Sequence, residues 1–398
     1  MKIAKRASQI SPSLTLELTA KAKKLKSEGR DIVSFGAGEP DFNTPEYIRD
    51  SAKQALDSGV TKYTPASGTV ELKNALCAKL MRDNGLEYKS ENIVISNGAK
   101  HSLANAFMAI IDDGDEVIVP APFWLTYPEL IRLAGGVPVI VNTTAQNGFK
   151  MTAEELKKAI TPKTKAVLIN NPNNPTGAVY TRDEIFALAE VIEQTDIVVI
   201  SDEIYEVLNY SGHEVVSIAS YSQKLKDQTI IINGVSKTYA MTGWRIGFIA
   251  APIAVAKAVA NMQSHMTSNP NSIAQYATVT AYNSPKGEEF LTQMHQSFSR
   301  RRALIMKKLD EMNLPYIRPD GAFYVMVNVS SLFGKKYDGV VIDSAFSLAT
   351  IMLDRASVTV IPCESFGAPE YVRLSYATSD EDIVKGIDRF KEFVKKVN

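Results

Sequence analysis

Seven short apolar runs recur between about residues 50 and 290, separated by stretches in which apolar residues have helical spacing. The runs are NIVIS (92–96), EVIVP (116–120), VPVIV (137–141), AVLIN (166–170), IVVIS (197–201), TIIIN (229–233) and IGFIA (246–250). Most are continuously apolar, which is typical of strands covered by helices on both faces. The pattern predicts an α/β fold whose large domain holds a mostly parallel seven-stranded sheet covered by helices.

The two ends of the chain have a different pattern. Residues 14–28 are spaced as an amphipathic helix that stops at Gly29, and beyond about residue 290 come a helix, the strand FYVMVNV, a helix, and the strands VTVIP and YVRLSYA. We expect a smaller α/β domain built from both chain ends. The expected division is an N-terminal arm and part of the small domain (1–45), the large domain (46–290) and the small C-terminal domain (291–398). Two domains also suit 398 residues, because single cores stop growing near roughly 250–300 residues.

Composition narrows the kind of partner. The 44 basic and 44 acidic residues cancel, which argues against nucleic acid and anionic membranes and favours small molecules. Two cysteines and four scattered histidines predict neither a disulfide framework nor a metal site. No apolar stretch suits a signal peptide or a membrane span, so we expect a cytoplasmic protein. We interpret the basic cluster Arg300–Arg302 as the solvated face of a helix.

Polar residues follow the predicted strands, where ligands bind in open α/β sheets. They are Gly98 after the first run, Trp124 after the second, Asn174 after AVLIN, Asp202 and Tyr205 after IVVIS, and Lys237 after TIIIN, with Arg245 just before the last run. Each has an ordinary structural explanation: Asp202 as the cap of a helix starting at Glu203, Trp124 as core, Lys237 as a surface lysine. Their joint placement at one crevice is poorly explained in that way.

This set of residues suits carbanion formation on an amino acid joined as an imine to pyridoxal 5′-phosphate, which is the electron sink. A lysine partly withdrawn from water, such as Lys237, is a nucleophilic amine for the resting Schiff base. Asp202 would keep the pyridine nitrogen protonated. The phosphate needs backbone amides at a helix N-terminus together with hydroxyl and guanidinium donors, which residues 98–100, Ser236 and Arg245 supply. The ring needs an aromatic face, and Trp124 offers one.

The run GVSKTYAMTGWRIG around Lys237 resembles the lysine motif of class I aminotransferases, which have the fold of type I pyridoxal-phosphate enzymes. NNPNNPTG, SDEIYE and YVRLSYAT resemble further signature segments of that family, in the same order, as do GAGEPDF and TKYTPASG (61–68). The resemblance extends from about residue 10 to the C-terminus. It implies that Lys237 forms the Schiff base and then moves a proton between the substrate Cα and the C4′ carbon of the cofactor, and that Asp202 pairs with the pyridinium.

The resemblance also implies the remaining contacts. Asn174 and Tyr205 would contact the ring oxygen and Trp124 would stack on the ring, while Gly98, Ala99, Lys100, Ser236 and Arg245 would surround the phosphate. Tyr63 would reach the phosphate of the neighbouring subunit, which implies a homodimer with shared active sites. Arg373 would hold the substrate α-carboxylate as a bidentate fork, assisted by the Gly38 backbone, Asn174 and Trp124.

The resemblance is less specific about the substrate. Aspartate aminotransferases of animals and enteric bacteria bind the distal carboxylate with an arginine, but this chain has none between Arg245 and Arg300, and it has Gly234 where that branch has a serine. It is more similar to a second bacterial branch, in which a lysine at the position of Lys100 meets the distal carboxylate. We therefore expect transamination of L-aspartate with 2-oxoglutarate to oxaloacetate and L-glutamate by a ping-pong mechanism. The alternatives are an aromatic amino acid or prephenate aminotransferase, or a carbon–sulfur lyase on the same fold.

Two other classes of function are less consistent with the sequence. A sensor domain of a transcription regulator is disfavoured by the neutral charge. A nicotinamide oxidoreductase is disfavoured because no G-x-G-x-x-G follows a first strand.

Overall fold

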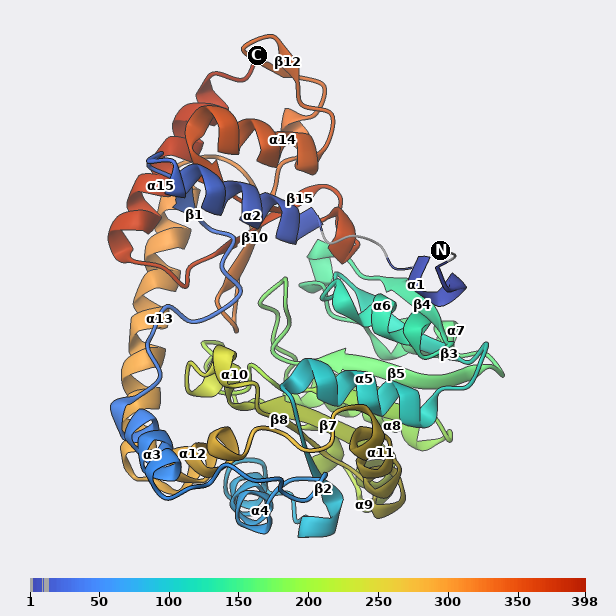
Figure 1. Cartoon of the computed structure of the whole chain (residues 1–398). Helices are drawn as coiled ribbons and strands as arrows, with labels where there is room; N and C mark the ends of the chain where they lie inside the picture. The colour runs from blue at the N-terminus through green and yellow to red at the C-terminus, as the bar shows by residue number, and fades with distance from the viewer. Residues whose placement is uncertain (1–2, 9, 11–13) are drawn as a thin grey trace.

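The computed structural model describes residues 3–8, 10 and 14–398 and consists of a large and a small body connected by the long helix α13 (Lys286–Asp310) (Figure 1). The sheet of the large body has, in spatial order, β2 (Ile93–Ser96), β8 (Gly247–Ala250), β7 (Thr229–Gly234), β6 (Val198–Asp202), β5 (Thr164–Asn170), β3 (Glu116–Ala121) and β4 (Val137–Asn142). The seven predicted strands are confirmed to within two residues at each end. Neighbouring strands from β4 to β7 are parallel, and only β8 runs against its neighbours, so the mostly parallel sheet is confirmed as well.

Helices cover both faces of this sheet, which explains why its strands are continuously apolar. One face packs on α5 (Ala99–Ile110), α6 (Thr126–Leu133) and α11 (Ile253–Met266). The other packs on α7 (Ala153–Ala159), α8 (Arg182–Glu193) and α9 (Gln223–Asp227), and near β2 and β8 on α4 (Val70–Asn84) and α12 (Ser272–Asn283), beside which lies α3 (Glu46–Asp57). Consecutive residues of one strand, such as Val167 and Leu168, therefore enter different cores, and both must be apolar.

The small body is assembled from both ends of the chain. Its antiparallel sheet has the order β14 (Ile361–Pro362), β15 (Tyr371–Ser375), β10 (Tyr324–Asn328) and β9 (Tyr316–Ile317). Around it lie α13, α14 (Ala345–Ile351), α15 (Asp380–Lys395) and α2 (Leu14–Ser27), which ends before Gly29 as predicted. From the N-terminal end, β1 (Val33–Ser34) pairs in parallel with β13 (Val358–Thr359). The remaining short elements are α1 (Lys5–Ser8), α10 (Val235–Thr238), β11 (Lys336–Tyr337) and β12 (Val340–Val341).

Two expectations need correction. The run VTVIP is not one strand, because the chain passes from one sheet to another at Val360: β13 pairs with β1, and β14 pairs with β15. The solvated face predicted for the basic cluster is wrong for two of its three members, since the side chains of Arg301 and Arg302 are only 11% and 8% exposed. Arg301 makes a bidentate ion pair with Asp41, with distances of 2.7 and 2.9 Å, and so connects α13 to the segment that enters the large body.

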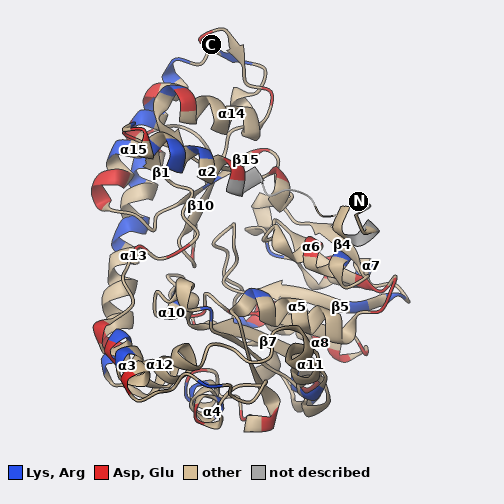
Figure 2. Cartoon of the chain, in the orientation of Figure 1, with Lys and Arg blue, Asp and Glu red and all other residues tan. Residues whose placement is uncertain are grey.

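The outer helices, among them α3, α13 and α15, carry both basic and acidic residues (Figure 2). No helix within the described residues combines the length and apolar character needed to cross a membrane. The expected domain boundary at 45/46 coincides with the start of α3, whereas that at 290/291 falls inside α13. The division of the chain at these two points stays a prediction.

Candidate active site

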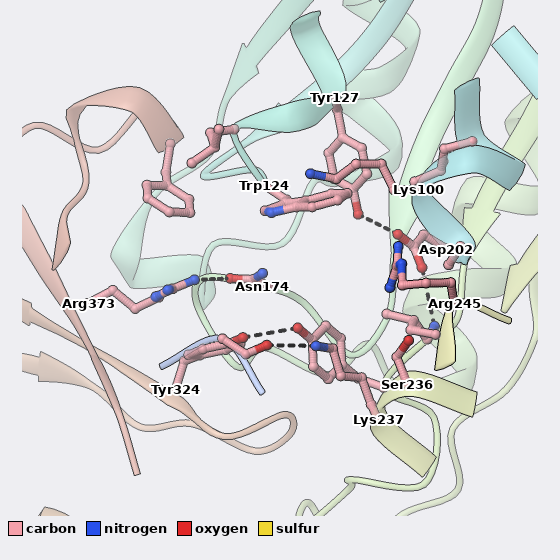
Figure 3. Close-up of a pocket in the computed structure, with 17 residues that line it drawn as sticks. Lys100, Trp124, Tyr127, Asn174, Asp202, Ser236, Lys237, Arg245, Tyr324 and Arg373 are labelled. Atoms are coloured by element: carbon pink, nitrogen blue, oxygen red, sulfur yellow. Dashed lines mark hydrogen bonds between the residues drawn. The ribbon is translucent and has the colours of Figure 1, made fainter. Parts of the chain in front are cut away.

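A pocket of about 330 Å³ lies beyond the carboxyl ends of the parallel strands and reaches the small body (Figure 3). The predicted site residues that line it are Gly38, Ala99, Lys100, Trp124, Asn174, Asp202, Tyr205, Ser236, Lys237, Arg245 and Arg373. They meet because β3, β5, β6 and β7 are parallel and end at one edge of the sheet, and each strand delivers its following turn there. Arg373 instead comes from β15 of the small body.

An anion cradle forms where α5 begins. Gly98 precedes the helix with a φ of 86°, a conformation that favours glycine, and no side chain caps the first amides of α5. A Cβ on Gly98 would lie 2.5 Å from the guanidinium of Arg245, so the arginine rests directly against the glycine. A Cβ on Gly247 would lie 2.2 Å from the backbone nitrogen of Ala99. Uncapped amides beside a guanidinium bind phosphate well.

Lys237 lies on the short helix α10, directly after β7. Its Nζ donates a hydrogen bond of 2.6 Å to the carbonyl oxygen of Gly38, which comes from the N-terminal segment (Figure 3). Desolvation lowers the pKa of this amine to about 8, with the nearby Arg373 and Arg245 acting in the same direction. An amine with such a pKa is partly neutral near physiological pH and can act as a nucleophile or a base.

Asp202 is buried at the end of β6, with 3% of its surface exposed. Tyr127 donates a hydrogen bond of 2.8 Å to Oδ2, and the amide of Ile204 donates one of 3.2 Å to Oδ1. The residues after Asp202 form a turn, so it does not cap a helix starting at Glu203. Burial raises the pKa of the carboxyl group to about 6, against the effect of both hydrogen bonds. A cationic partner in the pocket would stabilise the ionised form.

Arg373 is 6% exposed, and its Nη1 donates a hydrogen bond of 2.8 Å to Oδ1 of Asn174 (Figure 3). Its buried Nε has no hydrogen-bond partner among the described residues. The guanidinium carbon lies 4.2 Å from the ring centre of Tyr324 and 5.2 Å from that of Phe366. A buried cation with an unused donor is a suitable partner for a carboxylate.

Lys100 supplies a second cation on another side of the pocket. Its Nζ lies 4.7 Å from the ring centre of Trp124, and this indole in turn packs edge-to-face on Tyr127 at 5.4 Å. Desolvation lowers the pKa of Lys100, and the positive charge of Arg245 lowers it further. The pocket thus holds separate cationic groups on the two bodies.

Two predicted residues are not among those that line the pocket. Gly98 lies behind the lining, against the Arg245 guanidinium, and Tyr63 is 89% exposed and points to the surface of the single chain. Sequence reasoning missed six lining residues, namely Leu103, Leu125, Tyr127, Ile204, Tyr324 and Phe366. Pairing of β10 with β15 could have located Tyr324, because Met326 lies opposite Arg373. Tyr324 is two residues from Met326 on the same face, and is therefore a diagonal neighbour of the arginine. In the described ranges, no cluster of His, Cys, Asp and Glu is arranged to hold a metal ion.

The fold and the lysine-centred pocket define a class of enzymes, and residues 30–390 match the sequence model of the family described as aminotransferase class I and II. The chain belongs to this family and is an aminotransferase that depends on pyridoxal 5′-phosphate.

The names of similar proteins are narrower than the family description. The chain is 48% identical to the aspartate aminotransferase of Bacillus subtilis, over 100% of both chains, and 44% identical to the probable aspartate/prephenate aminotransferase of Aquifex aeolicus, over 99% of both. The aspartate aminotransferase structure from Rhizobium meliloti superimposes with a TM-score of 0.96 at 40% identity, covering 100% of both chains. The structure of the Thermus thermophilus aspartate aminotransferase with maleate gives 0.93 at 41% identity, covering 99% of this chain and 100% of the other.

The residues present fit the cofactor. The cradle formed by Gly98, Ala99 and Arg245 leaves no space for a Cβ and offers donors to a phosphate. Asp202 is a buried carboxylate with no cationic hydrogen-bond partner among the described residues, as expected of a group that faces a protonated ring nitrogen. The Lys237 amine lies in the same pocket and is already partly neutral, as attachment to an aldehyde requires.

Proposed function

We propose that the protein transfers the amino group of L-aspartate to 2-oxoglutarate, giving oxaloacetate and L-glutamate by a ping-pong mechanism. The observation that carries the proposal is the placement of Arg373, with an unused buried donor, and of Lys100 in one pocket with Lys237. Two cations suit the two carboxylates of aspartate, oxaloacetate, glutamate and 2-oxoglutarate. The relatives named aspartate aminotransferase support this choice, as does the Thermus thermophilus structure, which contains the dicarboxylate maleate.

We assign the following roles to residues of the pocket. When bound, pyridoxal phosphate supplies the electron sink for the electron pair that remains at the substrate Cα. Lys237 would hold the aldehyde carbon of the cofactor and move a proton from and to the substrate Cα. Asp202, in its ionised form, would keep a proton on the ring nitrogen. The side chains of Asn174 and Tyr205 would donate to the ring oxygen, and Trp124 would flank the ring.

In this proposal, different residues bind the phosphate of the cofactor and the carboxylates of the substrate. The first amides of α5, at Ala99 and Lys100, would bind the phosphate together with the Ser236 hydroxyl and the Arg245 guanidinium, with Gly98 allowing the close approach. Arg373 would bind the α-carboxylate through its unused donors while Asn174 anchors one end of the guanidinium, and the Gly38 backbone would assist. Lys100 would meet the distal carboxylate with its ammonium group.

The partner and the compartment belong to the same proposal. An 89% exposed tyrosine is unusual for so large a side chain, and we infer that Tyr63 reaches the phosphate of a second copy in a homodimer with shared active sites. Light scattering should then give twice the chain mass, and mixing a Tyr63→Ala variant with an excess of a Lys237→Ala variant should restore one functional site per mixed dimer. We further propose that the enzyme is cytoplasmic.

A second candidate substrate class is aromatic amino acids or prephenate. It is favoured by the Aquifex aeolicus relative, named as a probable aspartate/prephenate aminotransferase, and by Lys100, because an ammonium discriminates less by shape than a guanidinium fork. Elimination, as in a carbon–sulfur lyase, uses the same lysine and aspartate and is the less favoured alternative.

The test is kcat/KM for aspartate and for tyrosine, each with 2-oxoglutarate as amino acceptor, and for prephenate, which is itself a keto acid, with L-glutamate as amino donor. We expect aspartate to have the highest value, and release of pyruvate or ammonia instead of oxaloacetate would refute transamination. In the Lys237→Ala variant we expect cofactor bound without a covalent link and turnover reduced by at least about 10⁴-fold, because both the attachment and the proton transfer are lost. Retention of wild-type turnover would refute the assignment of Lys237.

A further inference from the structure

Tyr324 contacts both Arg373 and Tyr205 across the pocket, although no sequence motif marks it. It is the first residue of β10 in the small body and is 1% exposed. We propose that Tyr324 is a positioning residue with two separable roles, in which its ring orients the Arg373 guanidinium for the substrate carboxylate and its hydroxyl directs the proton of Tyr205 into the pocket. These roles presuppose the function proposed above.

The ring role follows from how Arg373 is held. Asn174 anchors one end of the guanidinium through a single hydrogen bond of 2.8 Å, about which the group could still swivel. The guanidinium lies over the Tyr324 ring, with 4.2 Å between the guanidinium carbon and the ring centre, and a cation over an aromatic face is attracted to it. The hydrogen bond and this ring contact, which is closer than the 5.2 Å contact with Phe366, together fix both position and orientation, leaving Nε available to the carboxylate.

The hydroxyl role follows from a count of protons. The Tyr205 and Tyr324 hydroxyl oxygens are 3.1 Å apart, and either can be the donor (Figure 3). Among the described residues neither hydroxyl has another hydrogen-bond partner in the structure. A phenol carries one proton, so Tyr205 can donate to a ring oxygen in the pocket only if Tyr324 donates to Tyr205. A hydroxyl that accepts one hydrogen bond also becomes a stronger donor in the next.

The contact joins the two bodies of the molecule. Tyr205 follows β6 of the large sheet, whereas Tyr324 belongs to the small sheet, and both are buried. The side chain that orients the carboxylate-binding arginine is therefore also the one that polarises a phenol on the opposite body. Two substitutions separate these roles: Tyr324→Phe removes the hydroxyl and keeps the ring, and Tyr324→Leu removes both.

The experiment uses the holoenzyme and measures the pH at which the absorbance band of the bound cofactor changes. If Tyr324 donates to Tyr205, Tyr324→Phe weakens the hydrogen bond from Tyr205 to the ring oxygen. More negative charge then stays on that oxygen and holds the proton of the lysine–cofactor linkage more tightly, which should raise the transition by about half a pH unit. If instead Tyr205 donates to Tyr324, the substitution frees the Tyr205 proton and the transition falls. A fall or no shift overturns the hydroxyl role.

The ring role is tested by binding of the dicarboxylate maleate, followed by the same absorbance. We expect the Kd for maleate to rise about tenfold in Tyr324→Leu and to stay within about twofold of wild type in Tyr324→Phe, since only the former loses the cation–π contact. An unchanged Kd in Tyr324→Leu, or an equal rise in both variants, overturns the ring role.

Tyr376→Phe is the matched control, because it removes another buried tyrosine hydroxyl of the small body, one that donates to the Ala322 carbonyl outside the pocket. It should leave both the absorbance transition and the Kd unchanged, and a shift equal to that of Tyr324→Phe overturns the specific role of the Tyr324 hydroxyl. Neither readout needs turnover. A wild-type enzyme that fails to transaminate aspartate therefore refutes the proposed function while the tests of Tyr324 still give an answer.

Discussion

Gly247 offers a direct test of the anion cradle, because alanine there would push the start of α5 out of place. Gly247 begins β8 and lies opposite Gly234, and its added Cβ would be 2.2 Å from the nitrogen of Ala99 and 2.4 Å from the carbonyl carbon of Gly98. These are backbone atoms, so no side-chain rotation relieves the overlap. Gly243, four residues earlier, has no atom within 4 Å of its added Cβ and is the matched control.

The size of the effect follows from these distances. Carbon and nitrogen atoms in contact are normally about 3.4 Å apart or more, so the helix start must retreat by about 1 Å. Amides that would bind an anion at about 2.8 Å then lie near 3.8 Å, beyond hydrogen-bonding distance. Loss of two hydrogen bonds to a charged group, each worth about 1.5–3 kcal/mol, should weaken phosphate binding by about 3–6 kcal/mol, or about 10²–10⁴-fold.

The assay is titration of the cofactor-free protein with pyridoxal phosphate, followed by tryptophan fluorescence. Gly247→Ala should raise the Kd by about 10²-fold or more, whereas Gly243→Ala should stay within about threefold of wild type. A wild-type Kd in a folded Gly247→Ala variant would refute the reasoning. Equal weakening by both substitutions would show that the effect is general rather than specific to the cradle.

Three further predictions concern charged side chains. Asp202→Asn should stabilise the cofactor-free protein by up to about 3 kcal/mol at pH 8 in thermal unfolding. Burial raises the pKa of the Asp202 carboxyl group to about 6, against the ordinary value of 3.8, so the wild-type protein loses stability as the pH rises from about 4 to 6. At pH 4 the carboxyl group is still largely protonated in the folded protein, and no gain from the substitution is expected there. Glu206→Gln should destabilise the protein by about 3–5 kcal/mol in urea unfolding, and adding Lys79→Met should recover most of this, because Glu206 and Lys79 form a buried ion pair of 2.5 Å. Lys100→Met should raise KM for aspartate about tenfold and change that for tyrosine less, since only aspartate carries a distal carboxylate; equal changes would contradict the role of Lys100.

Elements whose structure follows from the local pattern of residues could be predicted from the sequence. A strand buried on both faces has to be continuously apolar, and all seven apolar runs are strands of the large sheet. Six of them are largely buried, whereas the edge strand β4 is apolar although Val137 and Ile140 are exposed. The turns after them could be located for the same reason, which is why the order of the apolar runs sufficed to place Asn174, Asp202 and Lys237 at one edge of the sheet. The resemblance of the motif around Lys237 to that of class I aminotransferases then predicted pyridoxal phosphate as the cofactor.

Features that depend on long-range contact could not be predicted. Tyr324 and Phe366 enter the pocket through the packing of the small body on the large one, and no local pattern marks them. The burial of Arg301 depends on Asp41, at the far end of the chain, so a helix read alone shows only a basic patch. Likewise Val360 looks like the middle of one strand, and only the partners β1 and β15 divide it into two.

The pairing of β1 with β13 has a consequence for the order in which the protein becomes complete during synthesis. The large body is contiguous in the sequence and can close its sheet once β8 has left the ribosome. The segment of α2 and β1 is made early, yet its partners β13, β14 and α15 belong to the last part of the chain to be made. The apolar face of α2, with Leu18 and Ala22 buried in the finished protein, therefore stays uncovered while most of the chain is translated. Helix α2 and strand β1 can therefore complete their packing only after nearly all of the other elements have been made.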